Sequence, residues 1–336
     1  MTIKRFAAGA VQDFAAGLLQ RAGASEPQAL ETARHMVWCE RIGRHNFGLE
    51  RLDIHVKRLG AGGCNRMPVL RFERLGPSLA RLEGDSAMGF YPAAEAMRAA
   101  IIMASDTGIG SVGVRNSNFY GAGAYYVNLA AEAGMIGIAL SNSFPKVAAH
   151  GGLLPVIGTN PFAFGAPRRN GEHLLFDMAT SAMAGSSLRA AEAKGEASAE
   201  NLTGAGALLP FGGAKGFGVG LMVEILAGVL TGAGFGPGVS SMYGATGEPG
   251  ENGHYMMAID PARFIGLDAF FDRMDQLAAL TAASGGNAAL PGANRHREAA
   301  LSAAAGIVIP EAVCARSVAL ARQFGMNFPE PLAVAA

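Results

Sequence analysis

The sequence predicts an α/β protein, and three observations support this class. Helical and strand-like hydrophobic patterns follow one another along the 336 residues. Two strand-like runs, SVGVR at 111–115 and MIGIALS at 135–141, flank a helix-like run. Half of the residues are hydrophobic, which suffices for a sizeable core in two or three compact units. Both strands end in Asn, Ser and Gly residues, so residues 113–167 are predicted to form a ligand-binding face.

Composition limits the classes of partner. Lys+Arg and Asp+Glu both number 27, so the chain has no electrostatic footprint for nucleic acid or an anionic membrane. We expect a small, uncharged or singly charged ligand. Three widely spaced cysteines without metal-ligand spacing favour a reducing cytoplasm over a disulfide framework. The amino terminus has no signal-peptide pattern, and the longest apolar run, 217–230, is too short to span a bilayer, which takes about 20 residues.

The first unit, residues 1–67, is predicted to be helical. Apolar residues recur at helical spacing over 5–22, and Ser25-Glu26-Pro27 begins a second helix that runs to about residue 42. A turn then leads to a third helix over 49–59.

Short alternating segments at 69–75 and 79–85 predict strands, and a helix follows over 92–105. Beyond the proposed ligand face we predict strands at 173–179 and 254–260 and helices listed here: 181–194, a buried helix after the glycine-rich turn near 212, 261–283 and 309–324. The patch 195–207 has few apolar anchors and is predicted to be mobile.

The string Gly108-Ile-Gly110-Ser-Val-Gly113 matches the G-x-G-x-x-G pattern of dinucleotide folds. That pattern needs a strand before it and a helix after it. Here it follows a predicted helix and opens a strand, so we interpret it as a coincidence.

Three charged residues stand out. Asp177 ends an apolar strand, where a carboxylate needs a partner; it either caps the next helix or orients a catalytic group. Lys215 is the one charge in a glycine-rich turn at a helix start, where a cation opposes the helix dipole, which favours a functional contact. Arg51 is either a solvated helix charge or a carboxylate clamp, and its guanidinium fork suits the clamp.

Together these segments resemble the type-2 malate/L-lactate dehydrogenase family over nearly the whole chain. The family signatures RNSNHFG…GYY, EAGMIGIA, GTNPxAF, LDMATS, LLPFGGxKGxGLxLMVEILAG, GHxxxAIDP and LPGxxxxR appear here, in order, as RNSNFYGAGAYY, EAGMIGIA, GTNPFAF, FDMATS, LLPFGGAKGFGVGLMVEILAG, GHYMMAIDP and LPGANRHR.

The resemblance implies a non-Rossmann fold: a largely antiparallel sheet domain over 68–260, with a helical domain made of 1–67 and the helices of 261–336. It also implies a homodimer that acts on a small carboxylate substrate with NADH or NADPH and without a metal. It implies Asp177 as the catalytic orienting charge, Arg51 and Thr159 for substrate, and Lys215 with the loop 291–297 for cofactor. We further expect Asn46 and Phe47 to contact the substrate. The other residues expected to contact the cofactor are Asn118, Phe119, Tyr120, Ser141, Gly292 and Arg297.

Two departures concern proton transfer. Where the family has Asp-Ser-His-Gly-x-x-Arg, this chain has His45-Asn46-Phe47-Gly-Leu-Glu-Arg51, and the histidine of RNSNHFG is Phe119. Reduction of a ketone needs an acid at the developing alkoxide, which contributes about 10²–10⁴-fold. The family's segment between the DMATS helix and LLPFGG is also shortened here to about 195–207. Because residues of that segment help to form the wall of the site in the family, the sequence does not determine which substrate this chain uses.

Three outcomes remain open. The acid has moved to His150 or His45, with Tyr120 a weaker candidate. Alternatively, the substrate is a cyclic imine that enters protonated, so Arg51 holds its carboxylate and the phenylalanines form an apolar, cation-tolerant wall. In the third case the chain is a non-redox enzyme or an inactive homologue. We expect an NAD(P)H-dependent reductase of a small imino or 2-oxo acid, with the cyclic imine favoured.

Overall fold

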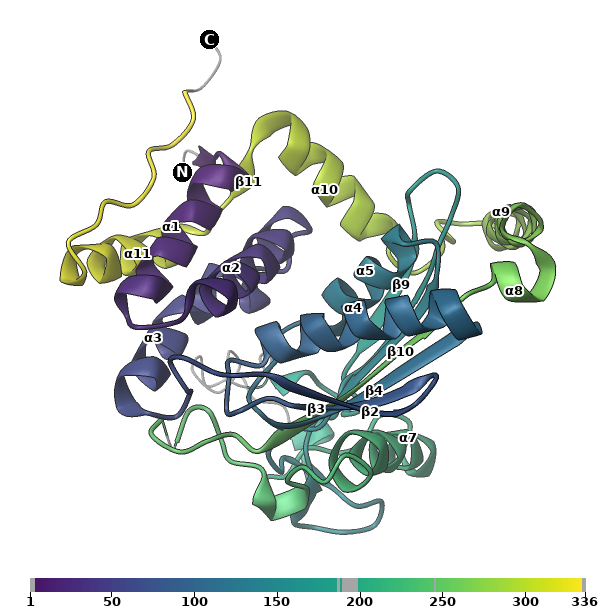
Figure 1. Cartoon of the computed structure of the whole chain (residues 1–336), viewed down its shortest axis with the longest axis horizontal. Helices are drawn as coiled ribbons and strands as arrows, with labels where there is room; N and C mark the ends of the chain where they lie inside the picture. The colour runs from purple at the N-terminus through teal and green to yellow at the C-terminus, as the bar shows by residue number, and fades with distance from the viewer. Residues whose placement is uncertain (1–3, 186–187, 189–198, 245, 334–336) are drawn as a thin grey trace.

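The computed structural model describes residues 4–185, 188, 199–244 and 246–333. Within these residues, seven strands form one mixed sheet in the order β2-β3-β4-β10-β5-β8-β9 (Figure 1). The strands are β2 (Arg71–Gly76), β3 (Leu79–Glu83), β4 (Ile109–Ser117), β10 (Asn252–Ile259), β5 (Ile136–Ser141), β8 (Phe162–Ala166) and β9 (Leu174–Met178). The prediction of an α/β class is confirmed.

Only one neighbouring pair in this sheet is parallel. Strand β3 runs parallel to β4 because the helix α4 (Phe90–Thr107) connects them as a crossover. The other neighbouring pairs are antiparallel, and β10 lies between β4 and β5, with Met256 opposite Val112 on one side and Ala139 on the other. The largely antiparallel, non-Rossmann sheet implied by the resemblance is therefore confirmed.

Helices cover both faces of the sheet. On one face, α4 packs on β4 and β10, and α5 (Gly123–Glu132) packs on β5 and β8. On the other lie α7 (Ala214–Glu224) and the π-helix η4 (Ile225–Val229), which contacts β10, β4 and β5 (Figure 1). The buried side chains of the α4–α5 face form a core with the strands that includes Met97, Val112, Tyr126, Ala163 and Met256.

A separate helical unit joins the two ends of the chain. It contains α1 (Ala8–Arg21), α2 (Glu26–Arg41), α3 (Leu52–Ala61) and α11 (Glu311–Gln323), and β1 (Arg5–Phe6) pairs with β11 (Ile307–Val308). Its core combines residues from both ends, such as Phe14, Leu19, Ile307 and Leu320. This arrangement follows from the apolar faces predicted at each end; the exact domain boundaries stay a prediction.

The remaining elements are short or peripheral. They are η1 (His45–Phe47), η2 (Leu49–Arg51), β6 (Val147–Ala148), β7 (Pro155–Ile157), η3 (Ala199–Asn201), η5 (Gly236–Gly238), α8 (Ala262–Ile265), α9 (Leu267–Ala283) and α10 (Ala293–Ala305). Helix α10 lies between the two helices predicted at 261–283 and 309–324 and was not predicted from the sequence. The helix predicted over 181–194 and the start of the patch at 195–207 lie largely outside the described residues.

Two expectations about glycine-rich segments have different outcomes. The G-x-G-x-x-G string caps the end of α4 at Gly108 and continues into β4, so its rejection as a dinucleotide motif agrees with the structure. The helix after Lys215 was expected to be buried, and this is wrong for the single chain. Its apolar side chains at 221, 225 and 230 are 41%, 46% and 62% exposed.

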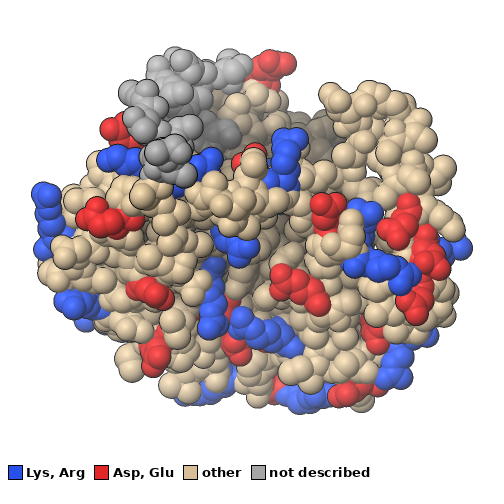
Figure 2. Space-filling model, turned by 90° about the horizontal axis from the view of Figure 1, so that it is seen from above, with Lys and Arg blue, Asp and Glu red and all other residues tan. Residues whose placement is uncertain are grey.

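Charges of both signs are interspersed over the face of the molecule in Figure 2. In the part of the chain that the structure describes, no helix is both long enough and apolar enough to cross a membrane.

Candidate active site

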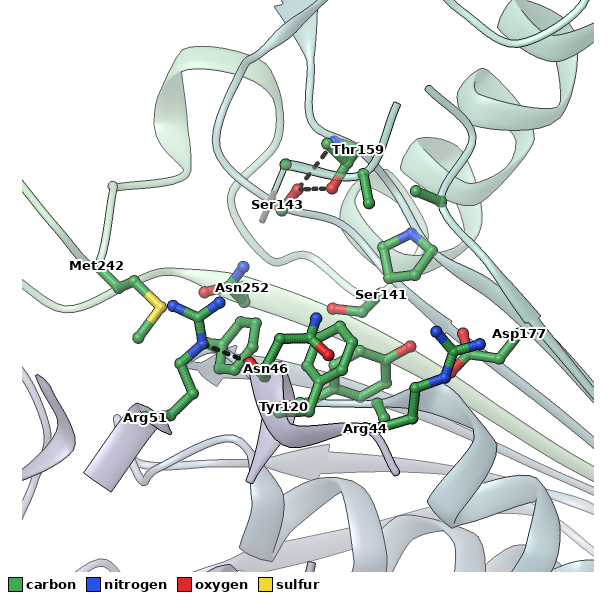
Figure 3. Close-up of a pocket in the computed structure, with 18 of the residues that line it drawn as sticks. Arg44, Asn46, Arg51, Tyr120, Ser141, Ser143, Thr159, Asp177, Met242 and Asn252 are labelled. Carbon is green, nitrogen blue, oxygen red and sulfur yellow. Dashed lines mark hydrogen bonds between the residues drawn. The ribbon is translucent and has the colours of Figure 1, made fainter. Parts of the chain in front are cut away.

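A cavity of about 570 Å³ lies between the helical unit and one end of the sheet (Figure 3). Its wall comes from η1 and η2, the turn between β4 and α5, the ends of β5 and β9, the segment 240–243, the start of β10, and α10. The volume lies in the range typical of small-molecule sites. The elements that meet here are far apart in sequence, so the site depends on the whole fold.

Arg51 is fixed at one end of this cavity. Its side chain is 7% exposed, Nε donates to the Asn46 carbonyl at 2.8 Å, and Nη1 donates to the Tyr243 hydroxyl at 2.6 Å. The guanidinium also lies 5.7 Å from the centre of the Tyr243 ring. These contacts hold the planar fork of donors at the cavity wall, where it can bind a carboxylate.

The two phenylalanines that stand in place of the family histidines face each other. The ring centres of Phe47 and Phe119 are 6.4 Å apart with planes 12° from parallel, and both line the cavity. Behind Phe119 lies His55, at 6.1 Å and fully buried. Burial lowers the pKa of His55 to about 3, so this ring is neutral. The site has an aromatic wall where proton-transferring groups were expected.

Asp177 marks the opposite end. Its Oδ2 accepts a hydrogen bond from the Ala124 N–H at 3.0 Å, so it caps α5 from the neighbouring strand β9. The sequence had offered a cap of the following helix instead. Burial raises the pKa of this carboxyl, while the hydrogen bond and the charges of Arg295 and Arg44 oppose the rise. In Figure 3 Arg44 lies beside Asp177. Carboxyls with perturbed pKa in a cleft are candidates for function.

Tyr120 lies in the wall between these ends. Its ring is stacked between Tyr126 and His254, with centroid distances of 5.1 and 5.0 Å. The residue is 2% exposed, and its hydroxyl has no hydrogen-bond partner among the described residues. Burial and the Asp177 carboxylate raise the pKa of this phenol well above its ordinary value. Tyr120 is therefore a fixed, protonated donor inside the site.

Ser141 and Thr159 belong to two hydrogen-bonded supports of the wall. Ser141 Oγ lies 2.9 Å from His254 Nδ1, and His254 Nε2 lies 2.8 Å from Ser117 Oγ. The Thr159 N–H donates to Ser143 Oγ at 3.0 Å. These hydrogen bonds hold Ser141 and Thr159, whose side chains carry hydroxyl groups, in fixed positions in the cavity wall.

The cavity collects many, but not all, of the residues expected from the sequence. The expected residues that line it are Asn46, Phe47, Arg51, Phe119, Tyr120, Ser141, Thr159 and Asp177. Asn118 is buried behind the wall, where it accepts from Arg58 and from the Gly250 N–H. It therefore organises the loops around the site.

The other expected residues lie outside the wall. His45 Nδ1 is 2.5 Å from Glu40 Oε2, and this contact raises the pKa of His45. The His150 ring is adjacent to Gly213. Lys215 is exposed at the start of α7, and Arg297 is exposed on α10. Gly292 has φ +106° and leads into α10 so close to β9 that an added Cβ would be 3.0 Å from the Leu175 nitrogen.

The sequence did not predict several polar residues of the wall, among them Arg44, Lys146, Tyr243 and Arg295. Arg295 lies in the same LPGANRHR segment that pointed to Arg297. Two residues along a helix change the direction of a side chain by about half a turn. Arg295 therefore faces β9, where it donates to the Leu175 carbonyl, whereas Arg297 faces outward.

The wall suits an anionic ligand with an aromatic ring. It carries four basic residues (Arg44, Arg51, Lys146, Arg295) and two acidic ones (Glu50, Asp177), an excess of two positive charges. The aromatic pair offers a flat apolar surface, and the Tyr120 hydroxyl and Arg295 Nε are buried donors without a partner in the described structure. A nicotinamide dinucleotide together with a small carboxylate fits this chemistry.

The chain matches the family model described as Malate/L-lactate dehydrogenase over residues 6–316. It is 38% identical over 287 residues to the malate dehydrogenase of Pyrococcus horikoshii, covering 79% of this chain and 78% of that protein. It is 35% identical over 302 residues to the L-sulfolactate dehydrogenase of Methanothermobacter thermautotrophicus, covering 85% and 87%. Both matches span most of the chain.

A third relative carries out a different reduction. The Delta(1)-pyrroline-2-carboxylate/Delta(1)-piperideine-2-carboxylate reductase of Pseudomonas syringae pv. tomato is 33% identical over 311 residues, covering 86% and 88%. The solved delta1-piperideine-2-carboxylate reductase structure from the same source superposes with a TM-score of 0.87 at 30% identity, covering 95% and 100%. The P. horikoshii structure gives 0.87 at 33%, covering 98% and 97%.

Proposed function

The chain belongs to the malate/L-lactate dehydrogenase family, and we propose that, within this family of NAD(P)-dependent oxidoreductases of small carboxylic acids, it reduces a cyclic imino acid or a 2-oxo acid. The observation that carries the proposal is the anchored Arg51 beside the Phe47–Phe119 pair. Arg51 would hold the substrate carboxylate, with Asn46 and Thr159 beside it, and the aromatic pair would cover the reacting carbon.

The aromatic pair favours the cyclic imine. A protonated imine accepts hydride without an enzyme acid, whereas a ketone needs a proton at its oxygen. Aromatic faces tolerate a cationic substrate. The similarity to a pyrroline- and piperideine-carboxylate reductase supports this choice.

The dinucleotide, NADH or NADPH, supplies the hydride. Phe119, Tyr120 and Ser141 line the cavity and would contact its nicotinamide end. The exposed Lys215 and Arg297 would contact its more distant anionic groups, and Gly292 would shape the segment before α10. Asn118 would act indirectly by fixing the loops behind the wall. Asp177 would orient the polar groups at its end of the cavity.

The proposal is tested by the absorbance of reduced nicotinamide. The purified chain is mixed with NADH or NADPH and a panel of Δ1-pyrroline-2-carboxylate, Δ1-piperideine-2-carboxylate, pyruvate and oxaloacetate. We expect oxidation of the cofactor, with the cyclic imino acids turned over fastest. Binding of the cofactor without oxidation across the panel would favour the second candidate, a non-redox enzyme or inactive homologue, which the loss of both family histidines supports.

We also propose a homodimer, formed through the outer face of α7 and η4. The acidic residue of this segment points inward: Glu224 is 3% exposed and accepts from the Gly236 N–H at 2.6 Å and from Asn160 Nδ2 at 2.5 Å. Six large apolar residues of this segment and of the residues just after it are exposed: Leu221, Met222, Ile225, Val229, Leu230 and Phe235. An outward apolar helix of this kind is typical of a surface that another protein covers.

Sedimentation velocity at micromolar concentration tests the dimer. The wild type is expected to sediment as a dimer and Ile225→Glu as a monomer, because a buried unpaired charge at an interface is strongly unfavourable. The matched control Leu280→Glu changes a 70% exposed residue on α9 and should stay dimeric. A monomeric wild type would contradict the proposal. We also propose a reducing, cytoplasmic compartment, because the three cysteines are free and widely spaced in the sequence.

A further inference from the structure

The hydroxyl of Tyr120 is a buried donor that the protein itself does not use. The residue is 2% exposed, its hydroxyl has no partner among the described residues, and it belongs to the cavity wall. A buried polar group without a partner destabilises the fold, so an unpaired hydroxyl in the wall of a ligand site is typical of a group that contacts the ligand.

The position of this hydroxyl is fixed by packing. The Tyr120 ring lies between Tyr126 and His254, with planes 15° and 11° from parallel. The Tyr126 hydroxyl donates to the Tyr120 carbonyl, which fixes the backbone as well. A ring held on both faces cannot swing away to find another partner.

Gly123 places the hydroxyl beside Asp177. A Cβ atom added to Gly123 would lie 2.9 Å from the Tyr120 hydroxyl oxygen and 3.3 Å from Asp177 Oδ1. The second oxygen of this carboxyl, Oδ2, is used by the Ala124 N–H. Oδ1 and the phenol therefore face the same small space, which a side chain at residue 123 would fill.

We infer that Tyr120 is the catalytic acid of this site, that it donates its phenolic proton to the reacting oxygen of a 2-oxo acid, and that Asp177 positions and reprotonates it. The inference rests on the proposed function. Neither His45, which contacts Glu40, nor His150 lines the cavity. The chain lacks the family histidine at 119 and carries this hydroxyl at the next residue.

The step balances as follows. The carbonyl carbon gains a C–H bond from the hydride of the reduced dinucleotide, which is thereby oxidised by two electrons. The C=O π pair moves to oxygen, and an O–H bond forms there as the Tyr120 O–H bond breaks. The phenolate then regains a proton from solvent, which the nearby Asp177 carboxylate relays. The raised pKa of the phenol supports this step, because the Tyr120 hydroxyl holds its proton until the carbonyl oxygen becomes basic.

Tyr120→Phe tests the catalytic part, because it retains the stacked ring and removes only the hydroxyl. We expect kcat for 2-oxo acids to fall about 10²–10⁴-fold, with KM little changed. Turnover of a cyclic iminium acid should stay near the wild-type value because it needs no acid. The control Tyr255→Phe removes another hydroxyl, which accepts from Ser111 away from the cavity, and should leave both reactions unchanged. Unchanged 2-oxo acid turnover in Tyr120→Phe would overturn the inference.

A second readout does not depend on turnover. In protein labelled at the tyrosine ζ carbon, the resonance absent from Tyr120→Phe identifies Tyr120 among the six tyrosines. Saturating oxamate with NADH should shift this resonance and leave that of Tyr255 in place, and Asp177→Asn should alter its pH response. A Tyr120 resonance that ignores saturating oxamate would overturn the inference, even in a chain without turnover. A wild type inactive on the whole panel but with a shifted resonance would refute the proposed reduction alone.

Discussion

At the Arg51 end of the cavity two nitrogens of the charged side chain donate to protein atoms, whereas at the Asp177 end two buried polar atoms have no partner among the described residues. Arg51 bonds to the Asn46 carbonyl and the Tyr243 hydroxyl. Around Asp177, the Tyr120 hydroxyl and Arg295 Nε are buried without a partner in the described structure. A pre-arranged anchor suits binding, and unused donors suit a reacting group.

This difference separates carboxylate recognition from proton transfer, two parts of the proposed activity that the family resemblance does not distinguish. The anchor matches the family pattern at Arg51, so recognition of a carboxylate is the part that resemblance supports best. Proton transfer is where the sequence departs, at Phe47 and Phe119. A family can keep a binding end while the acid moves, because a hydroxyl on a neighbouring residue can reach the same reacting oxygen.

Arg51→Lys tests the binding end and has the largest effect expected outside Tyr120. Lysine has no planar fork and cannot keep contacts to both Asn46 and Tyr243 while pairing with a carboxylate. Loss of a charged hydrogen bond costs about 1.5–3 kcal/mol, or about 10–150-fold in KM. We expect this rise for both imino and oxo acids, with kcat little affected, as measured by steady-state cofactor oxidation.

Tyr243→Phe is the matched, milder variant of the same end. It removes one hydrogen bond that holds Arg51 and should raise KM by a few-fold, because a single net hydrogen bond contributes about 0.5–1.5 kcal/mol. An Arg51→Lys variant that lowers kcat and leaves KM unchanged would mean that the two ends of the cavity are not separate in function.

Much of the fold was predictable because local patterns decide it. The helices α1 and α2 follow the apolar spacing seen in the sequence. The strands β4 and β5 are the strand-like runs of the predicted ligand face, and β10 matches the strand predicted at 254–260. The burial of α7 was mispredicted for a physical reason. An apolar run shows that a surface will be covered, but it does not show whether the same chain covers it, and Ile225 is 46% exposed here.

The site was predictable only where a motif fixes the residue. Arg51 and Asp177 followed from their motifs, and the structure brings both to one cavity. The hydroxyl of Tyr120 was a minor candidate because its isolation depends on the stacking of Tyr126 and His254, which no local pattern shows. Arg295 was not predicted as a site residue because the direction of a side chain on α10 depends on how that helix packs on β9.

Two buried histidines behind the cavity, His35 and His55, allow a test of whether a polar atom without a partner in the structure is truly unpaired. Both are fully buried with pKa lowered to about 3 by burial, but His35 Nε2 accepts the Ala122 N–H at 2.9 Å, whereas both ring nitrogens of His55 lack a partner among the described residues. His35→Leu should therefore cost about 1–3 kcal/mol, and His55→Leu should be neutral or stabilising at pH 7. The imidazole of His55 stays neutral in the folded chain, whereas in the unfolded chain it binds a proton as the pH falls below 6.5. The free energy of unfolding of the wild type therefore decreases with falling pH, and the stability advantage of His55→Leu should grow between pH 7 and pH 5. Urea unfolding at both pH values measures this.

If His55→Leu is as destabilising as His35→Leu, His55 has a partner that the structure does not reveal. An unpaired atom would then be weaker evidence for the role of Tyr120.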